Sequence, residues 1–281
     1  GQGHPERSSR LAHTLDHLET KEWFASLQTV DVVSCETEWL SRVHHPELIE
    51  RARVSCEQGL PYLDTPDVAI SPESFDVARL AAGTVLNLAD EIAHGHVDNG
   101  FALVRPPGHH AEHNAALGFC LFNNIAIAAR YLQNQHDLEK ILIVDWDVHH
   151  GNGTEDILHR AEGTAFISIH QHPAYPGTGQ KSFDNCHNFT VAPDSPNTTW
   201  RATATKALAT LKEFDPDLIC VSAGFDAYKR DPLCQQKLEI EDYTWIAQQL
   251  RALKKPQANI LEGGYSTDLP KLVLAYLKGL A

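Results

Sequence analysis

The hydrophobic pattern of the chain alternates between short, continuous apolar runs and longer stretches with helical spacing. The run Ile141–Val144 has no polar alternation, which is typical of a strand buried on both faces of a parallel sheet. Similar runs predict strands at 101–104, 165–170, 218–222 and 259–261, with a short candidate strand at 29–34. Helical spacing predicts helices at 11–18, 46–57, 71–95, 123–133, 154–159, 199–214 and 240–254, and from residue 269 onward. Strands that alternate with helices indicate an α/β fold with a largely parallel sheet flanked by helices.

Boundary residues refine two parts of this pattern. Ser71 is expected to be the N-cap of the helix at 71–95, with Pro72 at its first position. Proline, glycine and aspartate make 59–71 a loop, and a long loop is expected after residue 170. The stretch 180–197 is too irregular to assign. With no linker, repeat or low-complexity tract, residues 1–281 are expected to form a single domain.

Composition narrows the partners and the compartment. The 23 basic and 37 acidic residues give a net charge of −14, which argues against direct nucleic-acid binding and is compatible with cationic substrates. The six cysteines show no CxxC spacing, so free thiols in a reducing, cytoplasmic setting are expected. No apolar run reaches the ~18 residues that a membrane-spanning helix needs. The pattern does not indicate an oligomeric state.

The sequence contains 17 histidines and no methionine, not even at its first position. We expect either that the natural protein begins further upstream or that methionines are missing from the printed sequence, which would shorten some spacings by one residue. An intact mass that matches 31.2 kDa would exclude missing methionines.

Polar residues with metal-ligand chemistry follow the central apolar run. Asp145, Asp147 and His149 alternate with Trp146, Val148 and His150, and a glycine-rich turn comes next. Residues i and i+2 of an extended segment share a face, so the two carboxylates and the imidazole of the first set point the same way. Such a group is costly to bury unless a cation lies within it, and a divalent metal ion meets that need.

Three other predicted strands also end in polar residues next to glycine: His109 and His110 after 101–104, Asp226 after 218–222, and Tyr265 after 259–261. Parallel strands place their carboxyl ends at one edge of the sheet, so these groups are expected to converge on one pocket. Asp147, His149 and Asp226 then form a three-ligand set of the catalytic kind, with a histidine as base and the tyrosine as oxyanion donor.

Each feature alone has a structural explanation. Asp145 and Asp147 suit helix N-caps or a simple cation site, and a histidine pair or a Gly-Gly-Tyr turn often serves packing. Phe119 and Tyr175 suit a hydrophobic core. The joint occurrence at four strand ends is what favours a catalytic site.

Six segments resemble the zinc-dependent histone deacetylase superfamily. They are RPPGHHAEH (105–113), GFCLFNN (118–124), VDWDVHHGNGT (144–154), SIHQHPAYPGTG (168–179), SAGFDAYKRDPL (222–233) and LEGGY (261–265). The superfamily includes bacterial deacetylase-like amidohydrolases and acetylpolyamine amidohydrolases and has the arginase-like α/β fold. Asn152 and LEGGY are more similar to the class II branch. GQGHPERSSRL resembles the first active-site loop of the family, and the strand that usually precedes it is absent, so we expect a trimmed N-terminus.

The resemblance implies a role for each site residue. Asp147, His149 and Asp226 would bind the metal, which is Zn²⁺ by resemblance, although the ligand types do not exclude Fe²⁺ or Co²⁺. His110 would be general base and then acid, His109 would help to polarise the attacking water, and Asp145 would orient His109. Tyr265 would donate to the carbonyl oxygen.

The resemblance also implies substrate contacts and two departures from the family. Phe119 and Tyr175, with Gly118, would wall a tunnel for a linear acyl-amine chain; many relatives have phenylalanine where Tyr175 stands. Asn152 replaces an aspartate behind His110, which is expected to lower the pKa of His110. Asp64 or Asp67 would be a rim carboxylate. Asp145, Asp147, His149 and Ser168 would hold a structural K⁺.

The function implied is metal-dependent hydrolysis of N-acetyl amides of lysine side chains, which releases acetate and free amine. The nearest alternative is the deacetylation of acetylpolyamines; polyamine enzymes tend to carry an extra loop, and no long insertion is evident here. A non-catalytic binder of acylated amines and a two-metal, arginase-type ureohydrolase are the remaining hypotheses.

Overall fold

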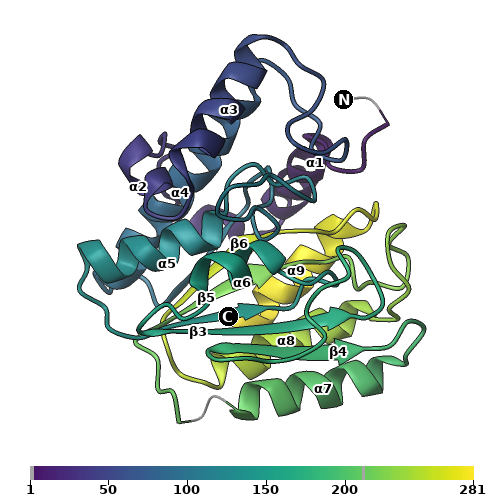
Figure 1. Cartoon of the computed structure of the whole chain (residues 1–281). Coiled ribbons are helices and arrows are strands. Elements are labelled where there is room, and N and C mark those ends of the chain that lie inside the picture. The colour runs from purple at the N-terminus through teal and green to yellow at the C-terminus, as the bar shows by residue number, and fades with distance from the viewer. Residues whose placement is uncertain (1–2, 211–212) are drawn as a thin grey trace.

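The computed structural model describes residues 3–210 and 213–281 of the chain. Within these residues, one six-stranded sheet has the order β1-β6-β5-β2-β3-β4, and all neighbouring strands are parallel. The strands are β1 (Asn99–Ala102), β2 (Ile141–Asp145), β3 (Thr164–Gln171), β4 (Cys186–Val191), β5 (Leu218–Ala223) and β6 (Gln257–Leu261). The predicted α/β fold is confirmed (Figure 1).

Helices cover both faces of the sheet. Hydrophobic side chains from α2 (Thr37–Ser41), α3 (Pro46–Glu57), α4 (Ser74–Ala93), α5 (Asn124–Gln135) and α6 (Asn152–Leu158) share one core cluster with one face of the sheet. Those from α1 (Ser9–Glu19), α7 (Asn197–Thr210), α8 (Ile240–Arg251) and α9 (Leu269–Leu280) share a second cluster with the other face. A short 3₁₀ turn, η1 (Phe24–Ser26), follows α1. The molecule therefore has three layers, with the sheet between two layers of helices.

The apolar run of β2 shows why this strand is central. Ile141 and Ile143 belong to the first core cluster, whereas Leu142 and Val144 belong to the second. All four side chains are at most 3% exposed. Continuous hydrophobicity, in place of alternation, is what a strand with helices on both sides requires.

Several elements differ from the predicted pattern, among them α2, which was not predicted. Residues 29–34 form no strand; the segment runs along α4, where Asn87 donates to the carbonyl of Asp31 and the Cys35 N–H donates to the carbonyl of Arg79. β4 was not predicted, because it is an edge strand with half-exposed polar positions. β1 begins and ends two residues earlier than the strand predicted at 101–104.

Two helix boundaries also differ. The helix expected from Ser71 begins at Ser74, because Ser71–Glu73 form a turn in which the Ser71 N–H bonds the Ser74 hydroxyl. α7 spans Asn197–Thr210, whereas the prediction ran to 214 and includes positions 211 and 212, which lie outside the described residues.

The connections create a switch point at the middle of the sheet. From β2 the chain moves to β3 and β4 on one side, then returns to place β5 on the other side of β2, followed by β6. Adjacent loops that leave in opposite directions open a crevice at the carboxyl ends of the strands. In this sheet the switch point lies between the ends of β2 and β5.

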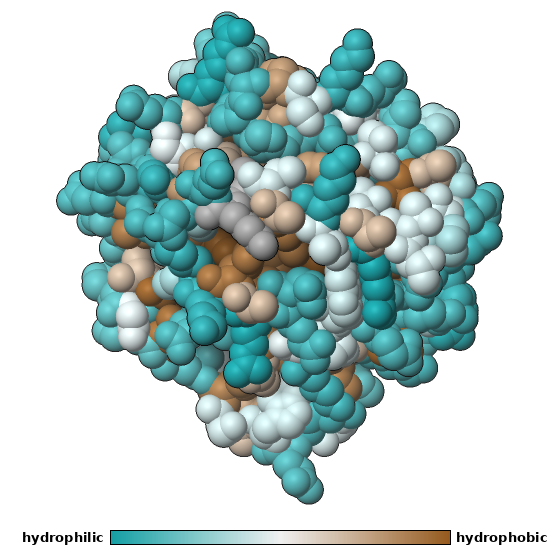
Figure 2. All heavy atoms as spheres, turned by 90° about the horizontal axis from the view of Figure 1, so that it is seen from below, coloured by the Kyte–Doolittle hydropathy of each residue, from teal (hydrophilic) through white to brown (hydrophobic). Residues whose placement is uncertain are grey.

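The face of the molecule on the side of α7 is mostly polar. Figure 2 views the side on which α7 lies in Figure 1 and shows hydrophilic residues over most of it, with hydrophobic residues gathered in a smaller central hollow. Among the described residues, no helix combines the length and the apolar character needed to cross a bilayer.

Candidate active site

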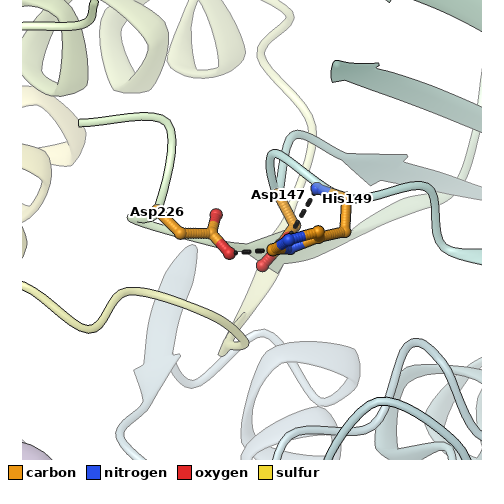
Figure 3. A group of neighbouring side chains, drawn as sticks. All are labelled: Asp147, His149 and Asp226. Atoms are coloured by element: carbon orange, nitrogen blue, oxygen red, sulfur yellow. Dashed lines mark hydrogen bonds and ion pairs between the residues drawn. The ribbon is translucent and has the colours of Figure 1, made fainter. Parts of the chain in front are cut away.

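Asp147, His149 and Asp226 meet at the switch point, as the sequence pattern predicts. Asp147 and His149 lie on the loop after β2, and Asp226 lies three residues after β5. One ligand atom from each side chain lies within 4.8 Å of the others (Figure 3). Both carboxylates are fully buried.

Backbone groups aim the two carboxylates at one point. Asp147 Oδ2 accepts from the Gly263 N–H at 2.8 Å, and Asp226 Oδ1 accepts from the Val148 N–H at 3.0 Å. The remaining oxygens face the imidazole, with Asp147 Oδ1 3.1 Å and Asp226 Oδ2 3.0 Å from His149 Nδ1. Asp226 Oδ2 is buried and, despite that proximity, makes no hydrogen bond to any described residue. An orphaned anionic oxygen in a buried site indicates a missing positive partner.

The electrostatics of the group favour a cation. Burial lowers the pKa of His149, but the carboxylates of Asp226 and Asp147 outweigh burial and raise that pKa well above its ordinary value. Burial raises the pKa of Asp226, and the charge on Asp147 raises it further. A positive charge is therefore stabilised here, as a proton on His149 or as a metal ion. Two carboxylates and an imidazole form a donor set that fits a divalent metal ion.

Two glycines let the loops approach these carboxylates closely. A Cβ atom added at Gly224 would collide with the Asp147 carboxylate, and one added at Gly263 would collide with the carboxylates of Asp147 and Asp226. Any side chain at either position would displace a carboxylate. The glycines at these strand ends are therefore part of the site.

His109 lies behind the ligand group and is held by carboxylates. Its Nδ1 is 2.9 Å from Asp145 Oδ2, and its Nε2 is 3.8 Å from Asp147 Oδ1. Burial lowers the pKa of His109, but Asp145 and Asp147 together raise it to about 10. Glu262, which sequence reasoning missed, accepts from the backbone N–H groups of Gly108 at 2.7 Å and His109 at 3.2 Å. The sequence could have identified Glu262, because it is the acidic residue of the LEGGY segment that directly follows a predicted strand.

His110 is held by an amide instead of a carboxylate. Its Nδ1 is 2.7 Å from Asn152 Oδ1, and the Asn152 amide in turn donates to Glu112 Oε1 at 2.7 Å. Burial lowers the pKa of His110 well below its ordinary value, and the charges on His109 and His149 lower it further. Gly118 packs against this ring so closely that a Cβ there would overlap it. The Asn152–Glu112 contact was not predicted.

Aromatic rings lie around His110 and Tyr265. The Tyr175 ring meets the His110 ring edge-on at 5.2 Å, and the Phe119 ring meets the Tyr265 ring edge-on at 5.7 Å. Tyr175 is 43% exposed, so it reaches the surface. The structure thus brings the predicted tunnel residues Phe119 and Tyr175 beside His110 and Tyr265. A cavity of about 720 Å³ lies beside Phe119, between residues 3–9 and 67–77, apart from the ligand side chains.

The structure separates the two candidate rim carboxylates. Asp67 Oδ2 accepts from the Gly118 N–H at 2.9 Å and from the Tyr175 hydroxyl at 3.2 Å, which places Asp67 beside the tunnel residues. Asp64 instead pairs with Arg51 through both oxygens and accepts from the Ala116 N–H. Asp64 therefore serves loop structure, and Asp67 is the carboxylate beside the predicted tunnel.

Tyr265 is anchored through its backbone and its ring. The Tyr265 N–H donates to Asp231 Oδ2 at 2.6 Å, and the Arg10 guanidinium lies 4.8 Å from the ring centre. Arg10 also donates to the carbonyls of Gly264 and Glu262 at 2.8 and 2.6 Å. Within the described residues, the Tyr265 hydroxyl makes no hydrogen bond, so it is free to donate to a ligand. Sequence reasoning missed Arg10 and Asp231, since neither belongs to a strand end.

Ser168 lies next to Asp145, as the predicted K⁺ set requires. The two residues are partners in the β2–β3 register. The Ser168 hydroxyl lies 2.9 Å from His170 Nδ1, and Asp145 Oδ1 accepts from the Asp147 N–H.

Comparison with known proteins identifies the family of the chain. The family description "Histone deacetylase domain" matches residues 4–280. A "Probable deacetylase" of Methanothermobacter thermautotrophicus is 35% identical, over 99% of this chain and 86% of that protein. The human "Polyamine deacetylase HDAC10" is 36% identical, over 94% of this chain but only 42% of that protein. The crystal structure of the HDA15 HD domain superposes with a TM-score of 0.93 at 36% identity, covering 100% of this chain and 83% of that one. The chain therefore belongs to the histone deacetylase domain family of deacetylases and amidohydrolases.

Proposed function

We propose that the protein hydrolyses N-acetyl amides of lysine side chains in a Zn²⁺-dependent reaction, as one catalytic domain. The observation that carries this proposal is the buried group of Asp147, His149 and Asp226, with His109 and His110 packed beside it. Three protein ligands leave coordination open, as catalytic zinc sites do. A bound ion would polarise the amide carbonyl and lower the pKa of a water molecule.

The residues of this chain then divide the proton transfers. His110, whose pKa is lowered by burial, is neutral at pH 7 and can take the proton of the attacking water. The same imidazole, once protonated, donates to the leaving amine. His109 is held by Asp145 next to the ligand group and would help to polarise the attacking water. The free hydroxyl of Tyr265 would donate to the carbonyl oxygen as it becomes negative.

A second candidate function is the deacetylation of acetylpolyamines. It is supported by the similarity to proteins named polyamine deacetylase and by Asp67, a carboxylate beside the tunnel that suits a distal ammonium group as well as a peptide N–H. We place protein or peptide acyl-lysine first, because the sequence shows no long insertion to narrow the site. Fe²⁺ or Co²⁺ would suit the same ligands, and we propose a structural K⁺ at Asp145 and Ser168.

The direct test is the release of free amine from acetyl-lysine peptides, longer acyl-lysine peptides, and acetylated putrescine, cadaverine and spermidine. We expect peptide turnover that a chelator abolishes and Zn²⁺ restores. Preference for the diamines would establish the second candidate function. No turnover of any substrate by a chain that binds zinc would leave a non-catalytic binder of acylated amines, and two divalent metal ions per chain would favour a ureohydrolase.

Tyr265→Phe tests the oxyanion donor. Because the hydroxyl makes no hydrogen bond to the described protein, the substitution should leave folding intact and lower kcat by about 10²–10³. Circular dichroism and thermal melting check the fold, and steady-state kinetics measure the loss. An unchanged kcat would remove Tyr265 from the reaction.

Asn152→Asp tests the group behind His110. A carboxylate 2.7 Å from Nδ1 stabilises the protonated imidazole, so the pKa of His110 should rise by about 1 unit or more. Since the base form is the neutral one, the acid limb of the kcat/KM profile should move to higher pH, with activity lost first at low pH.

In the Asn152→Asp variant the carboxylate of Glu112 would face the carboxylate of the new aspartate, and the repulsion would favour protonation of one of them. Replacing Glu112 by Gln in the same chain keeps the new carboxylate ionised and should give the full shift, whereas Glu112→Gln alone should leave the limb close to its wild-type position. An acid limb that stays in place in the double variant would show that His110 is not the titrating base.

Asp67→Asn, compared with Asp64→Asn, tests the rim assignment. Loss of a charge-assisted hydrogen bond to substrate, worth about 1.5–3 kcal/mol, should raise KM roughly tenfold or more in the Asp67 variant. The Asp64 variant loses its pair with Arg51 and should lower the melting temperature with little change in KM. Equal KM values for both variants and the wild type would contradict a substrate contact at Asp67.

A further inference from the structure

We propose that Cys234 is a positioning residue for the ligand His149, and that its sulfur accepts the Nε2–H of that imidazole. The inference rests on the proposed function in one respect, namely that His149 binds a metal ion through Nδ1. It adds a residue that lies eight positions after the ligand Asp226, on the same connection between β5 and α8.

The contact lies on the outer side of the ring. Cys234 Sγ is 3.6 Å from His149 Nε2, whereas Nδ1 faces the oxygens of Asp147 and Asp226 at 3.1 and 3.0 Å. Within the described residues, His149 Nε2 has no other hydrogen-bond partner. The sulfur therefore lies on the side of the imidazole opposite to the ligand oxygens and is not a fourth ligand. Its effect on a bound ion must pass through the imidazole.

The chemistry of a neutral histidine gives this contact its role. A neutral imidazole carries one N–H, and the nitrogen that binds a metal must offer its lone pair. A partner that accepts at Nε2 therefore keeps the proton there and keeps the Nδ1 lone pair directed between the two carboxylates. Histidine ligands nearly always have such a partner, most often a carboxylate, a carbonyl or water. In this chain the partner is a thiol.

The position of Cys234 is determined by both of its neighbours in the chain. The Leu233 N–H donates to Asp231 Oδ1 at 3.1 Å, and the Gln235 N–H donates to the side chain of Gln171 at 3.1 Å. Asp231 also accepts the Tyr265 N–H. The thiol is thus presented to His149 by a loop that is hydrogen-bonded on each side, and the same loop supports Tyr265.

Zinc affinity tests this role without reference to activity. We would measure the dissociation constant by competition with a chromophoric chelator for the wild type, Cys234→Ala and Cys234→Ser. Loss of the acceptor in Cys234→Ala should weaken zinc binding by about 10–100-fold. Cys234→Ser keeps an acceptor of similar size and should bind within a few-fold of the wild type.

Leu233→Ala is the matched control, because it changes the same loop at a side chain that is 37% exposed while it leaves the thiol in place. It should bind zinc as the wild type does, and circular dichroism confirms that all variants are folded. Wild-type affinity in Cys234→Ala, or equal losses in the Ala and Ser variants, would overturn the inference and leave the proposed function standing. A wild-type chain that binds no zinc would overturn both.

Discussion

The burial of several negative charges at one point is the constraint on which the rest of the site depends. Asp145, Asp147 and Asp226 have no exposed surface, and an isolated buried carboxylate is costly unless it is paired and hydrogen-bonded. The chain meets this cost with backbone N–H groups and with the imidazoles of His109 and His149, and it leaves one oxygen, Asp226 Oδ2, without a hydrogen bond. The raised pKa values of both histidines are consequences of that concentration of charge.

The parallel sheet makes this concentration geometrically feasible. β2 and β5 are neighbours with their carboxyl ends at the same edge, and the chain leaves them in opposite directions. The loops after β2, β5 and β6 can then meet at this edge, but only if the backbones of the last two come into contact with the carboxylates. Gly224, after β5, and Gly263, after β6, provide that contact, because any Cβ at either position would strike a carboxylate oxygen. Both the strand order and the two glycines are thus needed to bring the ligands together.

Sequence reasoning succeeded where a residue's role follows from a regular pattern. The apolar run of β2 and the polar residues at strand ends were enough to predict that Asp147, His149 and Asp226 converge on one site. It failed where contacts depend on loop paths: β4 has no apolar run, and residues 29–34 follow α4 in place of the sheet. Asp64 and Asp67 have the same chemistry three residues apart, and only the partners Arg51 and Tyr175 distinguish them. Cys234 was missed because it is 85 positions from His149, on a loop without periodicity.

The difference between residues placed by strands and residues placed by loops has a functional consequence. Asp147, His149, Asp226 and Tyr265 lie within four residues of a strand end, so their positions are determined by the same packing as the core. The entrance of the predicted tunnel is built differently. It contains Asp67, Gly118 and Tyr175, which come from three separate loops and are joined by two hydrogen bonds to a single oxygen, Asp67 Oδ2. Changes in those loops can alter which acylated amine is accepted without disturbing the buried carboxylates. Membership of the family therefore constrains the reaction more strongly than the substrate, and the substrate must be inferred from Asp67 and Tyr175.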